Sequence, residues 1–256
     1  MKFTNIFFSN KLLSLLVLSK TITYKYEIRP PRKIVMSFLI SDWYKFCIMR
    51  TRIYPTIRRD PMTHTQRQKL WLQLLIDLSK YVDKRVSKTG GHCAQVAKWA
   101  STTARELKMC NAEVNNIYWA SILHDIGKIG ISDRILRKKA ALTEDDWILI
   151  KMHPTIGSNI ISSIDALPSL AATISAHQEK YDGTGYPKGL KGKDIPLGAR
   201  ILGIADAYQA MVEDRYYREA RTHQEAVTEL QKVRGTQFDP DVLDVFINVV
   251  NSETVV

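Results

Sequence analysis

A helical hydrophobic pattern begins near residue 66 and continues almost to the end of the chain, and it limits the fold more than any other feature. Apolar side chains recur three or four residues apart, as on the buried face of a helix. No stretch alternates apolar and polar residues in the way that a half-buried strand does. With 45% hydrophobic residues among 256, the chain can bury a sizeable core. The pattern therefore predicts an all-α fold, a bundle of helices.

Breaks in the pattern divide the chain into helices. We expect helices at about residues 66–86, 92–107, 112–124, 167–177, 197–212, 223–233 and 239–249. Another begins near Thr143, where the sequence has the form of a capping box, and a further one begins with His153 at or just before its N-cap, because a proline follows. Residues 181–196 contain four glycines and two prolines and must form a loop. Such a loop in a helical protein usually serves a site, so we expect it to lie over one.

All of the excess positive charge lies in the first quarter of the chain. Residues 1–69 hold 14 lysines and arginines against 3 acidic residues, while the remaining residues hold 23 of each. One interpretation is a surface that binds anionic lipid or nucleic acid, since aromatic residues are interleaved with the basic ones. The interpretation that we favour is a basic N-terminal extension without selected structure and with no specific nucleic-acid partner. The folded domain is then expected at residues 70–256.

Cysteine use and the length of the apolar runs bear on the cellular compartment. Cys47, Cys93 and Cys110 cannot form a closed set of disulfides and lack the pair spacing of a metal site, which suits a reducing environment. The apolar run at residues 12–18 is far shorter than the roughly 20 residues that span a bilayer, and no signal-type cleavage site follows it. We expect a cytoplasmic protein.

Residues 122–128 place an imidazole, a carboxylate and an ammonium group among apolar neighbours. His124 and Asp125 are adjacent and can both bind one metal ion, while Lys128 lies one helical turn from His124. The flanking segments bury apolar faces, and an unpaired charge in a core is costly. These polar groups are therefore expected to point into a site.

Other side chains of the types that bind metals lie at the ends of predicted helices or on their apolar faces. Together the candidate ligands are His92, His124, Asp125, His153, His177 and Asp206. A single histidine on a helix is usually a hydrogen-bonded core residue, but four of the six histidines fall in this arrangement. Mixed imidazole and carboxylate donors suit iron, manganese or zinc, of which we favour iron or manganese. Six donors exceed the needs of one ion, so we expect two ions bridged by Asp125, an arrangement used for in-line attack on phosphate.

These residues carry a family resemblance. The run from His124 to Lys128, together with Asp182-Gly183-x-Gly185-Tyr186-Pro187, resembles the HD-GYP family, a branch of the HD-domain metal phosphohydrolases. The resemblance covers roughly residues 75–250 and includes residues 214–218 and 235–240. It implies an HD-type helical bundle with a metal centre. It also implies hydrolysis of cyclic di-GMP to linear pGpG or on to GMP, by a metal-activated water without a serine or cysteine nucleophile.

The resemblance also implies roles for individual residues. It makes metal ligands of His92, His124, Asp125, His153, His177 and Asp206. Asp125 would bridge the ions, and Lys128 would contact the scissile phosphate and stabilise charge in the transition state. Arg215 and Arg218 would anchor phosphate. Tyr186 would border the substrate cleft, and its loop is a candidate docking surface for diguanylate cyclase domains.

Two positions depart from the family pattern. Gln178 stands where the family usually has a second histidine, and a neutral amide is a weaker ligand for these metals. Lys88 stands where three-metal members have a glutamate ligand, so we expect two ions instead of three. If Gln178 weakens one ion site, the alternative is a module that binds cyclic di-GMP or a signalling partner with weak or no cleavage. A related phosphohydrolase with another nucleotide substrate is a third interpretation.

Overall fold

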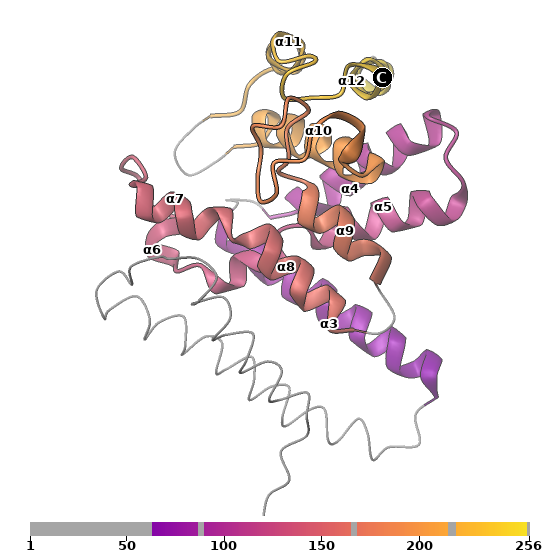
Figure 1. The fold of residues 1–256 in the computed structure, drawn as a ribbon, viewed down its shortest axis with the longest axis vertical. Helices are drawn as coiled ribbons and strands as arrows, with labels where there is room; N and C mark the ends of the chain where they lie inside the picture. Colours follow the sequence, from indigo (N-terminus) through magenta and orange to yellow (C-terminus); the bar gives the residue numbers. More distant parts are fainter. Residues whose placement is uncertain (1–62, 87–89, 165–167, 215–218, 255–256) are drawn as a thin grey trace, which may run out of the picture. The chain divides into compact units, whose positions relative to one another are not determined.

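Helices make up nearly all of the regular structure (Figure 1). The computed structural model describes residues 63–86, 90–164, 168–214 and 219–254. The α-helices are α3 (His64–Val86), α4 (His92–Glu106), α5 (Asn111–Leu123), α6 (Asp133–Leu136), α7 (Glu144–Lys151), α8 (His153–Ser162), α9 (Pro168–Ala176), α10 (Leu197–Val212), α11 (His223–Lys232) and α12 (Pro240–Thr254). Two 3₁₀-helices, η1 (Ile126–Gly130) and η2 (Gly192–Asp194), lie between them. The described part has no strand beyond an isolated bridge between Arg234 and Phe238, so the predicted all-α class is confirmed.

Helix starts agree closely with the sequence pattern. Thr143 forms the predicted capping box of α7: its hydroxyl accepts from the Asp146 amide at 3.2 Å, and the Asp146 carboxylate accepts from the Thr143 amide at 3.0 Å. Helix α8 starts one residue earlier than predicted: His153 is its first residue instead of its N-cap, and Met152 is the N-cap. The first described helix starts at His64, before the domain start predicted at residue 70, and that boundary stays a prediction because residues 1–62 lie outside the described part.

Two apolar clusters meet along α5. One cluster packs buried side chains of α4, α5, α10, α11 and α12, including Ile117 of α5. The other joins α3, α5, η1, α8 and α9, and includes Leu123, the last residue of α5. Each fully buried leucine or isoleucine contributes about 1.5–3 kcal/mol to folding. The two clusters therefore fix α5 on both sides, up to the point where His124 and Asp125 follow it.

Residues 181–196 contain turns and η2 and no α-helix. The segment is attached to the chain before α12 by backbone bonds from Tyr181 to Gln237 (3.0 Å) and from Asp182 to Thr236 (2.8 Å). The Glu179 carboxylate stabilises the loop by accepting hydrogen bonds from the backbone amides of Lys188 (2.7 Å) and Leu190 (3.1 Å). Its expected place over the metal centre stays a prediction. None of the helices in the described part is long and apolar enough to cross a membrane.

The η1 helix lies directly on the backbone of α8 because Gly127 has no side chain. A Cβ at Gly127 would stand 2.0 Å from the carbonyl oxygen of His153 and 2.6 Å from the amide of Gly157. Neither backbone atom can move without shifting α8. Backbone contact at this point holds the segment after His124 and Asp125 against the start of α8.

We predict that Gly127→Ala lowers the free energy of unfolding by about 3 kcal/mol, because overpacking a rigid contact strains both elements. The control is Gly130→Ala in the same 3₁₀-helix, where a Cβ meets only the Ile156 side chain at 3.5 Å. The control should change stability by less than about 0.5 kcal/mol. Urea unfolding of both variants measures the difference, and equal stabilities would contradict the backbone contact.

Candidate metal centre

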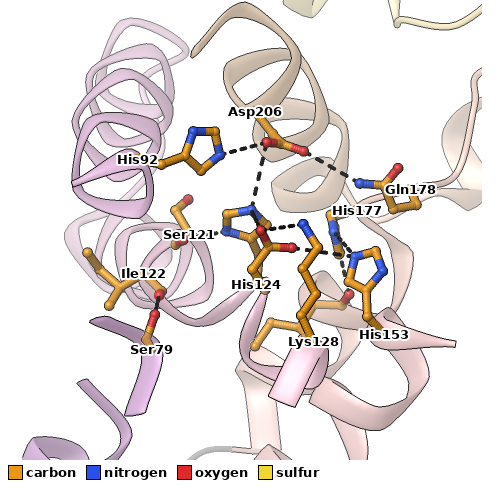
Figure 2. Close-up of polar contacts among 12 residues, drawn as sticks. Ser79, His92, Ser121, Ile122, His124, Lys128, His153, His177, Gln178 and Asp206 are labelled. Atoms are coloured by element: carbon orange, nitrogen blue, oxygen red, sulfur yellow. Dashed lines mark hydrogen bonds and ion pairs between the residues drawn. The ribbon is translucent and has the colours of Figure 1, made fainter. Parts of the chain in front are cut away.

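The structure brings all six sequence-predicted ligands to one place. Figure 2 shows this for the four histidines and Asp206. They come from the ends of four helices and the middle of a fifth. His92 and His153 begin α4 and α8, His124 follows α5, His177 follows α9, and Asp206 lies within α10, while Asp125 precedes η1. The histidines and Asp125 are buried, and Asp206 is partly exposed. Convergence of helix ends thus produces a polar centre inside an otherwise apolar bundle.

Three of the histidines are oriented in the same way. In each ring Nδ1 lies 2.7 Å from the backbone carbonyl three residues earlier: His124 on Ser121, His153 on Ile150 and His177 on Ile174. A carbonyl only accepts, so each Nδ1 carries the proton. In a neutral ring the other nitrogen, Nε2, then has a free lone pair, which is the form that binds metal. The helix termini therefore present three lone pairs to the centre.

These lone pairs face one another without a proton between them. Nε2 of His153 and Nε2 of His177 are 3.2 Å apart, and the buried Nε2 of His124 has no hydrogen-bond partner among the described residues. Burial lowers the pKa of His153 to about 3 and that of His177 to about 4, so both rings are neutral at pH 7. Buried acceptors that face each other are costly. A metal cation fits this donor set.

Two carboxylates complete the set. Oδ1 of Asp125 lies 3.6 Å from Nε2 of His153, and its Oδ2 lies 3.6 Å from Nε2 of His124. The two oxygens of Asp125 thus face different imidazoles. Oδ1 of Asp206 lies 3.8 Å from Nε2 of His124. Potential ligand atoms gather into two groups that share His124, one with His92 and Asp206 and one with Asp125 and His177.

Both carboxylates are ionised at neutral pH. Burial on its own raises the pKa of Asp125, but the nearby charges, the Lys128 ammonium first, lower it well below the usual range. Nζ of Lys128 lies 2.6 Å from Oδ2 of Asp125. The pKa of Asp206 is likewise depressed against its burial, chiefly by its hydrogen bond to His92. The centre therefore combines the neutral imidazoles of His153 and His177 with carboxylate anions.

Lys128 is held in position by η1 and by α3. Its backbone amide donates to the carbonyl of Asp125 at 2.9 Å. The Arg85 guanidinium of α3 donates to the carbonyl of Ile131 at 2.6 Å and to the carboxylate of Asp133 at 2.7 Å, which anchors the end of η1. With its backbone held in this way, Lys128, which the sequence placed near His124, directs its ammonium group to Asp125.

Gln178 lies at the edge of the centre, between Asp206 and the predicted loop. Its amide nitrogen lies 3.5 Å from Oδ2 of Asp206, and its amide oxygen accepts from the Tyr186 hydroxyl at 3.2 Å. Burial, followed by the charges of Asp125 and Asp206, raises the pKa of Tyr186, so its hydroxyl stays protonated. Tyr186 is thereby connected to the centre through the amide.

A family model described as "HD domain" matches residues 73–242, more than half of the chain. The chain belongs to the HD-domain family. This confirms the resemblance seen in the sequence. The family is one of metal-dependent phosphohydrolases, and the grouped histidines and aspartates of this HD domain could bind metal.

Curated proteins similar to this HD domain are phosphodiesterases by name. A cyclic di-GMP phosphodiesterase of Thermotoga maritima is 38% identical over 180 residues, covering 70% of this chain and 48% of the relative. A 3'3'-cGAMP-specific phosphodiesterase of Vibrio cholerae is 34% identical over 177 residues, covering 68% and 34%. The chain thus spans less than half the length of these relatives.

A solved structure has the same fold. The crystal structure of a cyclic GMP-AMP-specific phosphodiesterase of Vibrio cholerae matches with a TM-score of 0.56 at 19% identity, over 72% of this chain and 49% of that one. The similarity confirms the helical HD-type bundle that the sequence predicts. Lys88, Arg215 and Arg218, three positions singled out in the sequence, lie outside the described residues, and their roles stay predictions.

Sequence reasoning missed Glu213, which orients the first histidine of the HD domain. His92 differs from the other rings because both of its nitrogens face carboxylates: Nδ1 lies 2.8 Å from Glu213 and Nε2 lies 3.0 Å from Asp206. Burial opposes protonation, but the bonds to Asp206 and Glu213 raise the pKa of His92 to about 9. Glu213 is buried and follows Asp206 by seven residues, or two helical turns. Glu213 is the C-cap of α10, and its position about two turns after Asp206 could have indicated the pair.

We predict that manganese stabilises metal-stripped protein by about 2.7 kcal/mol at a hundred times its dissociation constant, because only the folded state gathers the ligands. His177→Ala should lose most of this stabilisation. The matched control is His223→Ala, which removes a histidine that instead bonds Tyr208 and Asn251. Thermal unfolding with and without Mn²⁺ tests this, and an unchanged metal response of His177→Ala would exclude His177 from the centre.

Glu213→Ala is expected to weaken Mn²⁺ binding about 10- to 100-fold, because the imidazole of His92 loses the carboxylate that orients it. Isothermal titration of metal-stripped protein measures the affinity. Glu106→Ala, at the opposite end of α4 and exposed, should leave it unchanged. Equal affinities of the Glu213 variant and the wild type would show that the contact does not support metal binding.

Proposed function

We propose that this chain is a metal-dependent phosphodiesterase domain that hydrolyses cyclic di-GMP to pGpG, to GMP, or to both. The observation that carries the proposal is the buried centre in which three imidazole lone pairs and two carboxylates meet beside the Lys128 ammonium. The names of the curated relatives support the substrate class. The centre supplies what a phosphodiester requires, namely sites for cations and a positive group next to them.

For the cofactor we infer two divalent ions, iron or manganese. The two oxygens of Asp125 face the imidazoles of His153 and His124, which supports two adjacent ions with Asp125 between them, and mixed imidazole and carboxylate donors suit these metals. The oxygen of Gln178 accepts from Tyr186, so the amide has a function other than ligation. When bound, such ions activate water and neutralise charge on the phosphate oxygens.

The side chains of the chain perform the remaining tasks. Lys128 can donate from its ammonium to a phosphate oxygen that gains charge in the transition state, and Asp125 holds that ammonium in place. Tyr186 borders the centre and offers a protonated hydroxyl. The thiol of Cys93 is buried, and burial raises its pKa well above the usual value, so no thiolate nucleophile is present there. These features support direct hydrolysis without a covalent intermediate.

Two alternative functions and two predicted contacts were also derived from the sequence. Gln178 motivates a module that binds without cleaving, which the phosphodiesterase relatives do not favour. The relative specific for 3'3'-cGAMP supports that cyclic dinucleotide as a second candidate substrate. Contact between the loop around Tyr186 and diguanylate cyclase domains stays a prediction from the sequence, as does membrane contact of residues 1–69.

We expect Mn²⁺- or Fe²⁺-loaded full-length protein to convert cyclic di-GMP to pGpG or GMP. His124→Ala and Asp125→Ala should abolish turnover, and Lys128→Met should lower kcat by about 10²- to 10³-fold through loss of transition-state stabilisation. Chromatographic separation of the products measures the reaction, and far-UV circular dichroism verifies that helicity is retained. His223→Ala serves as the control with normal activity.

The outcomes separate the proposals. Binding of cyclic di-GMP with no product would favour the non-cleaving module. Cleavage of 3'3'-cGAMP alone would replace the substrate and keep the reaction class. Retained hydrolysis by His124→Ala or Asp125→Ala would refute the assignment of the centre.

A further inference from the structure

A second ammonium group lies at the edge of the centre, on α7. Lys151 is the last residue of α7 and comes two residues before His153, the first residue of α8, so its backbone lies close in sequence to a candidate ligand of the centre. Helix α7 leads directly into α8 (Figure 1). Its Nζ lies 5.7 Å from the centroid of the Tyr186 ring. The hydroxyl of Tyr186 in turn donates to Gln178. One aromatic ring and one amide therefore separate Lys151 from Asp206.

The two lysines near the centre differ in their surroundings. Lys128 is largely buried, and its charge is paired with Asp125 at 2.6 Å. Lys151 is exposed, and no carboxylate of the described residues lies within ion-pair distance of it. A cation over an aromatic face gains roughly 0.5–1 kcal/mol at an exposed site, which favours this orientation of the side chain without neutralising its charge. Lys151 therefore offers an unneutralised positive charge next to the Tyr186 ring.

This arrangement matches the charge pattern of a cyclic dinucleotide. Such a molecule carries two phosphodiester anions, and only one of them can occupy the centre during a single cleavage. The other anion must lie outside the ligand set, away from Lys128, which in the proposed function contacts the cleaved phosphate. An ammonium group has three donors and suits a phosphate as a point charge. The edge defined by Tyr186 and Lys151 provides such a group.

Building on the proposed function, we propose that Lys151 binds the phosphate of the cyclic dinucleotide that is not being cleaved, with the Tyr186 ring holding its side chain in position. Lys151 would then raise the affinity for the substrate and favour substrates that carry two phosphates. It takes no part in bond cleavage. The competing explanation is that Lys151 only supports Tyr186.

The test compares two substrates on Mn²⁺-loaded full-length protein. Cyclic di-GMP has two phosphodiesters, and bis(p-nitrophenyl) phosphate has one. Lys151→Ala should raise KM and the equilibrium Kd for cyclic di-GMP about 10-fold, which corresponds to about 1.4 kcal/mol. It should change kcat for cyclic di-GMP, and KM for bis(p-nitrophenyl) phosphate, by less than about twofold, because the contact lies away from the cleaved phosphate.

Two further variants identify the cause. Lys151→Arg keeps the charge and should restore KM for cyclic di-GMP to within about threefold of the wild type. Lys139→Ala removes an equally exposed lysine from the segment before α7 and should leave both substrates unaffected. Equal KM changes for the two substrates, a fall in kcat alone, or failure of Lys151→Arg to restore affinity would overturn the proposal in favour of a supporting role.

The same measurements distinguish this proposal from the proposed function. A wild type that binds cyclic di-GMP and does not cleave it contradicts the phosphodiesterase, and the Kd ratio of wild type and Lys151→Ala then decides the role of Lys151. A wild type that cleaves cyclic di-GMP with a KM unchanged in Lys151→Ala contradicts only the role of Lys151. A wild type that neither binds nor cleaves it refutes both.

Discussion

The hydrogen bond from an imidazole Nδ1 to the carbonyl three residues earlier is the interaction on which the centre depends. It occurs at three helix ends, on His124, His153 and His177, with the same 2.7 Å length. Each bond gives a backbone carbonyl near the end of a helix a donor from the ring, and it fixes the tautomer of that ring. The Nε2 atoms of these rings then face the centre. The same hydrogen bond that forms at each helix end therefore also sets the tautomer of the ring that faces the centre.

Without a cation, this arrangement of polar groups is energetically unfavourable. The packing around it holds the groups together nevertheless. Facing lone pairs and ionised aspartates oppose folding, since buried polar groups without partners are costly. Apolar clusters on both sides of α5 and the backbone contact at Gly127 supply the opposing stabilisation. A bundle built this way offers a preformed site that could bind a metal, and the free energy of such binding would add to the stability of the fold.

Much of the fold and of the candidate centre could be predicted from the sequence. The remaining contacts could not, for physical reasons. Hydrophobic periodicity located the helices, and positions at helix ends indicated most of the candidate ligands that the structure brings together, because both are local properties of the chain. Glu213 was missed because its importance arises from a contact with His92, 121 residues away. The contact between Lys151 and Tyr186 likewise joins α7 to a loop that no periodic pattern describes. Contacts between distant segments depend on packing, which spacing alone does not determine.

Gln178 shows how the structure changes an interpretation drawn from residue types. As a ligand, a neutral amide looks like a weakened imidazole. In the structure the same side chain accepts from Tyr186 and lies within reach of Asp206, which requires a donor and an acceptor on one short planar group. A neutral imidazole whose one nitrogen bound a metal could not also serve both neighbours. The amide therefore connects the Gly- and Pro-rich segment to a carboxylate of the centre, and the position of Tyr186, with Lys151 on its ring, depends on that connection.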